Sequence, residues 1–467
     1  MFKTETYVAR RNELRKKFKS GLILLTGNGE SAANYPGNPY PYRQDSTFLY
    51  YFGLNRPGIT GVMDIDAGTD CLFGSETSLD DIIWMGPQPT LREEGATVGI
   101  KSTYPLGEFL SVMNRAIKRG RKIHFLPQYR DSNSLRISQW LGIAPERIKD
   151  YVSRDLIRAV VEMREIKSAE EIVQIEEACE IAYRMHTAAM KMCRPGLYER
   201  NIAGRIQGIA FEMGAGPSFR PIVSQNGQTL HNHDYSGKLT EGKLLLIDAG
   251  AENNMNYCSD YTRTLPVSGK FTDRQRDIYS IVLAANQKAQ SLAKPGKTYT
   301  EIHLEAMRIM AEGLQGLGLI KGNIDEAMAN GAPALFMPHG LGHQMGLDVH
   351  DMEGLGEKYV GYDEMTERST QFGLGSLRMG KTLREGHVLT VEPGIYFIPE
   401  LVRKWKSEHI NSAYINFQRV ESYLDFGGIR LEDNILITSR GSRQLGRHKT
   451  PITVEQVEET MSRNYEQ

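Results

Sequence analysis

The chain has 467 residues, of which 40% are apolar and 24% are charged, and this composition is typical of a globular protein. Its 56 basic and 57 acidic residues give a formal net charge of -1. The chain therefore has no excess of positive charge that would attract nucleic acid or an anionic membrane, and we expect neither partner. A single core stops growing near ~250–300 residues, so this length predicts two domains.

The cysteines and the N-terminal stretch predict a cytoplasmic protein. Four cysteines lie far apart with no CxxC pair, which excludes a disulfide framework and a cysteine-based zinc site: Cys71, Cys179, Cys193 and Cys258. The apolar run at 21–26 is too short for a signal segment, and no later run approaches the ~20 apolar residues that a membrane span needs.

Residues 21–165 alternate short apolar strands with helical stretches, as at 22–25, 61–66 and 107–118. This alternation predicts a self-contained α/β domain. The pattern changes near 161–167, where we place the boundary between domains 1–165 and 166–467. Ser168 and Thr272 each open a capping box before a long helix, and Pro-Gly ends each helix, at 195–196 and 295–296.

The order helix, Pro-Gly, helix, strands thus occurs twice, about one hundred residues apart. This repeat suggests an internal duplication, in which helices cover a shared sheet and leave a central site between the halves. Pro-Gly is also common stop chemistry after any helix, so the pattern alone leaves both interpretations open.

Acidic residues at strand ends give the first functional signal. Asp248 ends the apolar run 244–247, where a buried carboxylate is costly unless a cation or donors compensate it. Asp260 lies in the next predicted strand, and the turn-rich segment between them predicts a hairpin that brings the two acids together. Adjacent carboxylates repel, and a divalent metal relieves that repulsion. Taken alone, the pair fits metal ligands and turn aspartates equally well.

Three histidines gather in the segment MPHGLGHQMGLDVHD, at His339, His343 and His350. Gly340 and Gly342 disfavour a helix, which argues against the helical HExxH motif of zinc proteases and predicts extended or looped structure. A lone histidine is usually structural, but three within twelve positions, in a chain with 11 histidines, favour a site.

Glu392 and Glu432 also follow β-rich apolar residues, as Asp248 does. Together with the two aspartates and the histidines they predict a carboxylate-rich dinuclear metal site. Four carboxylates balance the charge of two divalent ions. Oxygen-dominated ligation with one imidazole favours manganese, cobalt or zinc, and we expect Mn²⁺.

These segments resemble the proline-specific pita-bread metallopeptidases, the family of aminopeptidase P and prolidase. The resemblance covers about 162–440, and in the N-terminal half it includes YPYRQDSTF (40–48) and WMG (84–86). It implies an α/β fold with an N-terminal domain of the creatinase/aminopeptidase P type. The second domain would be a pita-bread catalytic domain with a pseudo-twofold internal duplication.

The resemblance also implies a role for each candidate ligand. Asp248 would bind one metal ion, His343 and Glu392 would bind the other, and Asp260 and Glu432 would bridge the two. A water between the ions would be the nucleophile, and Glu392 would pass its proton to the leaving proline nitrogen.

Further residues would contact the substrate by the same resemblance. His350 and His339 would contact it and stabilise the oxyanion, His231 would also contact it, and Arg430 would orient the bridging glutamate. Trp84, expected on a loop of the N-terminal domain, matches residues that in relatives reach toward a neighbouring subunit's active site. It therefore predicts a homodimer or homotetramer.

One spacing departs from the family pattern. The family usually places its first two aspartates eleven residues apart, whereas Asp248 and Asp260 are twelve apart. A one-residue shift within a strand would turn Asp260 to the opposite face. The extra residue must therefore lie in the 253–256 turn or in a bulge, or the assignment of Asp260 fails.

The activity that the resemblance implies is release of an N-terminal residue that precedes proline, an Xaa-Pro aminopeptidase. A close alternative is an Xaa-Pro dipeptidase (prolidase), because the chain carries an insertion at 353–381 that contains Arg378. A guanidinium suits the free carboxylate of a dipeptide, although Arg378 fits a solvated loop residue equally well.

Two further interpretations assign the chain to other classes of protein. One is a metal-free amidine hydrolase such as creatinase, and the other is a catalytically silent binding protein. Both predict eroded ligand positions, whereas all five are present here.

Overall fold

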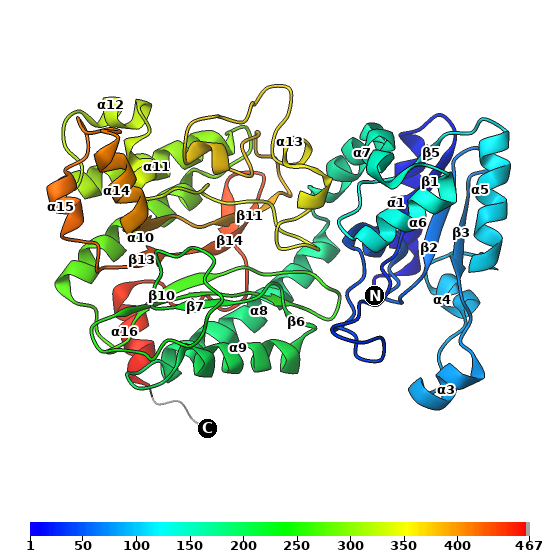
Figure 1. The fold of residues 1–467 in the computed structure, drawn as a ribbon, viewed down its shortest axis with the longest axis horizontal. Coiled ribbons are helices and arrows are strands. Elements are labelled where there is room, and N and C mark those ends of the chain that lie inside the picture. Colours follow the sequence, from blue (N-terminus) through cyan, green and yellow to red (C-terminus); the bar gives the residue numbers. More distant parts are fainter. Residues whose placement is uncertain (464–467) are drawn as a thin grey trace. The chain divides into compact units, whose positions relative to one another are not determined.

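The computed structural model describes residues 1–463 and divides the chain into two compact units. The first unit comprises Met1–Arg164 together with Met352–Tyr359, and the second comprises Glu165–Asp351 and the chain from Val360 onward. Figure 1 shows the elements of each unit.

The first unit contains a five-stranded mixed sheet in the order β4-β3-β2-β1-β5. Strands β1, β2 and β3 are antiparallel neighbours, while β4 and β5 pair in parallel with β3 and β1. The strands are β1 (Leu22–Thr26), β2 (Thr60–Asp64), β3 (Thr69–Gly74), β4 (Ser102–Pro105) and β5 (Ile123–His124). The helices are α1 (Thr4–Lys16), α2 (Ser46–Phe52), α3 (Leu79–Met85), α4 (Leu91–Thr97), α5 (Phe109–Lys118), α6 (Asp131–Leu141) and α7 (Arg154–Arg164).

Aromatic side chains from the sheet and two helices form the core of this unit. The ring of Phe109 on α5 lies 5.1 Å from that of Phe73 on β3 and 4.3 Å from that of Trp140 on α6. Residues from β1 and β2 complete the cluster. This arrangement confirms the predicted α/β character of the N-terminal half.

The expectation that Trp84 lies on a loop is wrong. Ser78 and Asp81 form a capping box that starts helix α3, and Trp84 lies in its last turn. No residue of α3 is buried, and the Trp84 side chain is 79% exposed. Its apolar residues therefore form an uncovered surface.

The second unit carries short sheets and long helices. Its strands are β6 (Gly216–Pro217), β7 (Ile222–Ser224), β8 (Leu244–Asp248), β9 (Ala251–Glu252), β10 (Thr262–Pro266), β11 (Val388–Val391), β12 (Gly394–Tyr396), β13 (Gly428–Arg430), β14 (Asp433–Ile437) and β15 (Ser442–Gln444). Its helices are α8 (Ala169–Met192), α9 (Glu199–Met213), α10 (Asp273–Leu292), α11 (Tyr299–Gly316), α12 (Ile324–Ala329), α14 (Pro399–Ser407), α15 (Phe417–Glu421) and α16 (Val454–Ser462). Helix α13 (Glu357–Val360) begins within the short segment of the first unit and ends on the first residue after it.

Strand β8 lies between β7 and β10, and β14 lies between β11 and β15, all antiparallel. The strands lie between the helix pair α8–α9 and the helix pair α10–α11 (Figure 1), and both pairs contribute to one apolar core. Among residues 1–463, no helix has the length and apolar character needed to cross a membrane.

The two predicted helix hairpins are present, and their hydrogen bonds repeat. Capping boxes start α8 and α10, and the loops that follow these helices contain Gly196 (φ +91°) and Gly296 (φ +86°). The amide of Gly196 donates to the carbonyl of Leu239 (2.9 Å), and the amide of Gly296 donates to that of Leu383 (3.0 Å). The two halves of this unit are therefore built on the same local plan.

The segments that begin at these two leucines are also alike. Residues 239–248 read LTEGKLLLID and residues 383–392 read LREGHVLTVE. Each segment contains a left-handed glycine, runs through a buried strand (β8 or β11) and ends on an acid. Asp248 and Glu392 thus occupy equivalent positions in the two halves.

Candidate metal centre

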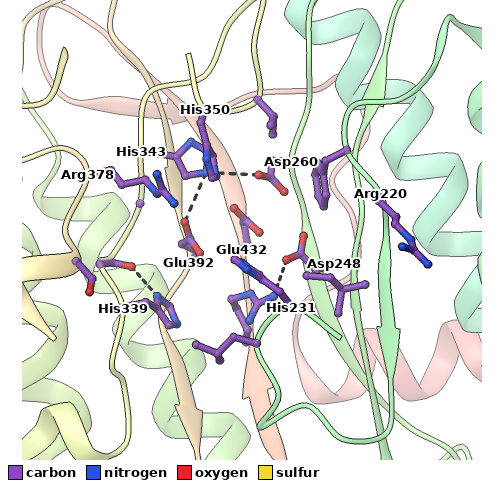
Figure 2. A pocket seen from close by; sticks show the side chains of 18 of the residues that line it. Arg220, His231, Asp248, Asp260, His339, His343, His350, Arg378, Glu392 and Glu432 are labelled. Atoms are coloured by element: carbon purple, nitrogen blue, oxygen red, sulfur yellow. Dashed lines mark hydrogen bonds and ion pairs between the residues drawn. The ribbon is translucent and has the colours of Figure 1, made fainter. Parts of the chain in front are cut away.

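A cavity of about 340 Å³ in the second unit brings the predicted site residues together. Figure 2 shows acidic and histidine side chains that come from separate strands and loops. The lining includes every site residue predicted from the sequence except Trp84: His231, Asp248, Asp260, His339, His343, His350, Arg378, Glu392, Arg430 and Glu432.

The β8–β10 hairpin places Asp260 beside Asp248. Thr262 pairs with Asp248 across the ladder, so Asp260, two residues earlier, faces the same side as Asp248. Asp260 precedes β10 and does not lie within the strand, which differs from the expectation. The segment 253–256 forms a turn, in which Asn256 takes φ +63° and the Asn253 side chain accepts from two following amides. The hairpin therefore satisfies the condition that the sequence sets for Asp260.

The histidine segment is looped, as predicted, and backbone contacts with β11 fix it. The amide of His343 donates to Thr390 Oγ1 (3.1 Å), and the amide of Thr390 donates to the carbonyl of His343 (3.0 Å). A Cβ at Gly342 would lie 2.2 Å from the carbonyl oxygen of Thr390, so only glycine permits this approach.

A buried ion pair anchors the far end of the same loop. Lys167 Nζ lies 2.8 Å from Asp351 Oδ2, and both side chains are 1% exposed. Because Asp351 directly follows His350, this pair fixes the main chain that carries that histidine. Removing one partner of such a pair would leave an uncompensated buried charge.

His343 presents one nitrogen to the acids. Its Nδ1 lies 3.0 Å from the carbonyl oxygen of Gln344, which can only accept, so Nδ1 carries the proton. Nε2 is left as a lone-pair donor, 3.5 Å from Asp260 Oδ2 and 3.6 Å from Glu392 Oε1. This tautomer is the one that a metal ligand needs.

The buried carboxylates lack the partners that their charges require. Asp248 Oδ1, Asp260 Oδ1 and Glu432 Oε1 are buried oxygens without a hydrogen-bond donor. Burial, reinforced by the neighbouring negative charges, raises the pKa of Asp260 and of Glu432, and burial raises the pKa of Glu392. Ligand atoms of Asp260, His343 and Glu432 lie within 4.8 Å of one another. These side chains therefore fit a divalent cation, which would supply the missing positive charge.

Arg430 reaches the acids by two routes. Its Nη2 donates to Asp248 Oδ2 (2.5 Å), and its Nε donates to Thr262 Oγ1 (3.1 Å). Thr262 Oγ1 in turn donates to Glu432 Oε2 (2.8 Å). The arginine expected to orient the glutamate thus contacts Asp248 directly and Glu432 through a threonine.

His339 is occupied on both ring nitrogens. Burial, followed by repulsion from Arg430, lowers the pKa of His339 to about 3, so the ring is neutral. Nδ1 donates to the carbonyl of Gly340 (2.8 Å), and Nε2 accepts from the hydroxyl of Tyr396 (2.9 Å). In this arrangement both ring nitrogens of His339 make hydrogen bonds within the protein.

Tyr396 is one of the residues at the site that the sequence did not indicate. Its hydroxyl accepts from Arg430 Nη1 (2.8 Å) and donates to His339, so it links the histidine loop to the acids. The only sequence signal is its place on strand β12, four residues after Glu392. Two further basic residues that were not predicted, Arg220 and His233, also line the cavity.

A duplicated α/β unit with an acid-rich, histidine-containing cavity at its strand ends defines a metallohydrolase. Residues 173–439 match metallopeptidase family M24, and residues 7–124 match the aminopeptidase P N-terminal domain. The chain belongs to metallopeptidase family M24. The predicted fold class, an N-terminal aminopeptidase P domain followed by a pita-bread domain, is confirmed.

Similar proteins carry two activity names. The chain is 33% identical to the Xaa-Pro aminopeptidase of Escherichia coli over 453 residues, covering 94% of each chain. It is 30% identical to the human Xaa-Pro dipeptidase over 457 residues, covering 95% of this chain and 89% of that protein. Proline aminopeptidase P II from Yersinia pestis superposes with a TM-score of 0.81 at 30% identity, covering 99% of this chain and all of the other.

The raised carboxyl pKa values predict a pH-dependent stability of the metal-free protein. Native carboxyls with raised pKa values hold protons that the unfolded chain releases above about pH 4. Their stabilising contribution is complete below that pH and is lost as pH rises through the native pKa. We therefore expect the calorimetric Tm of metal-free wild type to fall more steeply between pH 5 and 8 than that of Asp260→Asn.

The exposed Asp277→Asn substitution in the same unit controls for a general charge effect, and its slope is expected to match wild type. Saturating Mn²⁺ is expected to flatten the wild-type slope, because bound cations keep the acids ionised. Equal slopes for wild type and Asp260→Asn without metal would contradict the prediction.

Proposed function

We propose that this protein is an Xaa-Pro aminopeptidase that releases the N-terminal residue from peptides with proline in the second position. The observation that carries the proposal is the set of unpartnered buried oxygens on Asp248, Asp260 and Glu432, which share one cavity with His343 and Glu392. Relatives that match nearly the whole chain bear this activity in their names.

We assign two divalent ions to the cavity, with Mn²⁺ as the native metal and Co²⁺ or Zn²⁺ as substitutes. Asp248 would hold one ion, His343 and Glu392 the other, and Asp260 with Glu432 would lie between them. Bound ions of this kind lower the pKa of water and polarise a carbonyl group. Four carboxylates neutralise two such ions, which suits a buried site.

The protein's own side chains would handle the proton and the substrate. Glu392 is positioned by Thr390, whose hydroxyl lies 3.4 Å from its Oε1, and burial raises its pKa, so it can take up a proton and return it to the leaving nitrogen. His350 and His231 line the cavity and are the residues that we assign to the oxyanion and the substrate. His339, held by Tyr396, would form part of the wall that contacts the substrate.

Proline specificity follows from the chemistry of the scissile bond. A bond that precedes proline is a tertiary amide without an N–H, and the proline φ is fixed, so enzymes that grip an extended backbone handle it poorly. A cavity of about 340 Å³ can instead recognise a compact pair of residues by shape.

A dipeptidase (prolidase) is the second candidate, because Arg378 lines the cavity. Figure 2 places Arg378 on the side of His343 and Glu392, and its charge acts on Glu392. A guanidinium there could hold the free carboxylate of a dipeptide through paired hydrogen bonds. Such a contact would favour dipeptides without excluding longer peptides.

The first test compares two substrates on metal-stripped enzyme to which Mn²⁺, Co²⁺ or Zn²⁺ is returned. Initial rates are measured for an Xaa-Pro dipeptide and for the same dipeptide extended by two residues. We expect no turnover before metal addition and turnover of both substrates afterwards. Turnover of the dipeptide alone would establish the dipeptidase instead, and turnover of neither with metal bound would refute the proposed substrate.

The role of Arg378 is tested by Arg378→Ala. Charge-assisted bonds to a carboxylate contribute about 1.5–3 kcal/mol, so we expect KM for the dipeptide to rise roughly 10- to 100-fold with a smaller change for the tetrapeptide. Arg368→Ala, in the same insertion but outside the cavity lining, serves as the matched control. An unchanged dipeptide KM would remove Arg378 from substrate binding.

We also propose that the protein forms a homodimer or homotetramer through the surface around Trp84 and resides in the cytoplasm. Leu79, Ile83, Trp84 and Met85 are each at least 68% exposed on a helix without a buried residue. Aromatic residues of this kind are enriched in interfaces.

Light scattering tests the assembly. Wild type is expected to show at least twice the mass of one chain, and the double variant Ile83→Asp/Trp84→Asp is expected to shift toward the mass of one chain. Leu110→Asp, at another exposed apolar position of the same unit, is the control that should leave the mass unchanged. A wild-type protein with the mass of one chain and full activity would contradict the prediction.

A further inference from the structure

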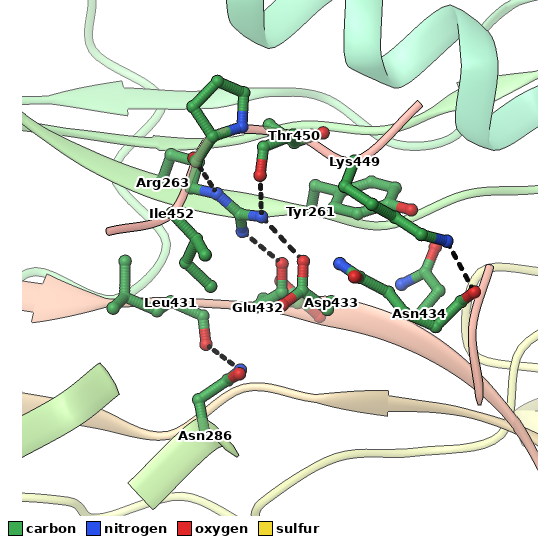
Figure 3. A network of polar contacts seen from close by, with 12 residues as sticks. Tyr261, Arg263, Asn286, Leu431, Glu432, Asp433, Asn434, Lys449, Thr450 and Ile452 are labelled. Carbon is green, nitrogen blue, oxygen red and sulfur yellow. Dashed lines mark hydrogen bonds and ion pairs between the residues drawn. The ribbon is translucent and has the colours of Figure 1, made fainter. Parts of the chain in front are cut away.

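Three buried side chains hold the main chain of the candidate ligands from outside the cavity. They are Arg263 on β10, Asn286 on α10 and Asn434 on β14, each 0% exposed and none part of the cavity lining. Figure 3 shows them around the segment that contains Glu432. We call these three residues the rear clamp.

The side chain of Asn434 hydrogen-bonds to both polar main-chain atoms of Asp260. Its Oδ1 accepts from the amide of Asp260 (3.0 Å), and its Nδ2 donates to the carbonyl of Asp260. A single side-chain amide thus fixes the peptide groups on either side of this Cα. Because Asp260 precedes its strand, no β-ladder hydrogen bond would otherwise fix it in this way.

Arg263 connects the segment that contains Asp260 to the main chain of Glu432. It follows Asp260 by three residues, and its Nη1 donates to the carbonyl of Glu432 (2.6 Å) while its Nη2 pairs with Asp433 Oδ1 (2.7 Å). Its Nε donates to the carbonyl of Pro451 (2.8 Å), which holds the guanidinium from behind. The strand that follows each acid therefore supplies a side chain that hydrogen-bonds to the backbone of the other acid.

Asn286, on helix α10, hydrogen-bonds to the main chain just before each of the two glutamates. Its Nδ2 donates to the carbonyl of Val391 (2.9 Å) and to that of Leu431 (3.1 Å). These residues directly precede Glu392 and Glu432. One amide group thus links the main chain of the two segments just before these acids.

We propose that the rear clamp consists of positioning residues that set the spacing of Asp260, Glu392 and Glu432 before any metal binds. Without a cation, the acids repel one another, and unrestrained strand ends would separate to relieve that repulsion. Metal ligands must lie within about 0.2 Å of their required distances, so any such separation costs affinity. The inference rests on the proposed two-metal centre and deepens it.

Calorimetric titration of Mn²⁺ into metal-free protein tests the clamp without relying on activity. Outer contacts of metal sites are worth roughly 10- to 100-fold in affinity, and we expect a weakening of that size in Asn434→Leu, which keeps the side-chain volume and removes both hydrogen bonds. Asn286→Ala, which alters a helix and leaves the strands intact, is expected to weaken binding in the same way and serves if Asn434→Leu does not fold.

Asn416→Ala is the matched control. Its side chain also holds two main-chain atoms in the second unit, the amide of Arg419 and the carbonyl of Gly318, but neither residue is a candidate ligand or adjacent to one. We expect it to lower Tm and to leave Mn²⁺ affinity at the wild-type value. Wild-type affinity in both Asn434→Leu and Asn286→Ala would overturn the clamp alone, whereas wild-type protein that binds no metal would overturn the clamp and the proposed function together.

Discussion

The mutual repulsion of buried carboxylates is the constraint on which the catalytic unit depends. Asp248, Asp260, Glu392 and Glu432 share one cavity. Burial, reinforced by the neighbouring negative charges, raises the pKa of Asp260 and of Glu432, and three of the four acids have a buried oxygen without a hydrogen-bond donor. A fold that relied on these side chains alone would open at this point. Instead, Arg430 neutralises part of the charge, and the main chain beneath the acids is held by ladders and by buried amide and guanidinium groups. The resulting cavity is rich in carboxylates and suited to cations.

Much of the fold could be predicted from local chemistry. Capping boxes and Pro-Gly stops act within a few residues, so the starts and ends of α8 and α10 are readable from the sequence. The acids could also be identified from the sequence. Burying an ionised carboxylate at the end of an apolar strand costs free energy, so an acid at such a position indicates a compensating partner. Trp84 was misplaced because Ser78 and Asp81 cap a helix that has no buried face and hence no apolar periodicity.

The contacts that the sequence could not reveal are those between distant segments. Tyr396 joins His339 to Arg430, yet nothing near Tyr396 in the chain distinguishes it from any strand tyrosine. The same holds for Asn434, whose partner Asp260 lies 174 residues away. The two hydrogen bonds of the His339 ring are likewise not indicated by its place in a histidine cluster.

Because the second unit is built from two similar halves, the cation site forms only where the two halves meet. Asp248 and Glu392 end equivalent segments, so each half brings one acid of the same structural ancestry to the cavity. The centre therefore resembles the isologous interface of a twofold dimer whose subunits have been joined into one polypeptide. Neither half holds the complete ligand set, and a folding intermediate with only one half formed would have no competent cation site. Cation binding therefore requires that both halves have docked. A divalent ion that binds only this assembled state would stabilise it relative to states in which the halves are apart.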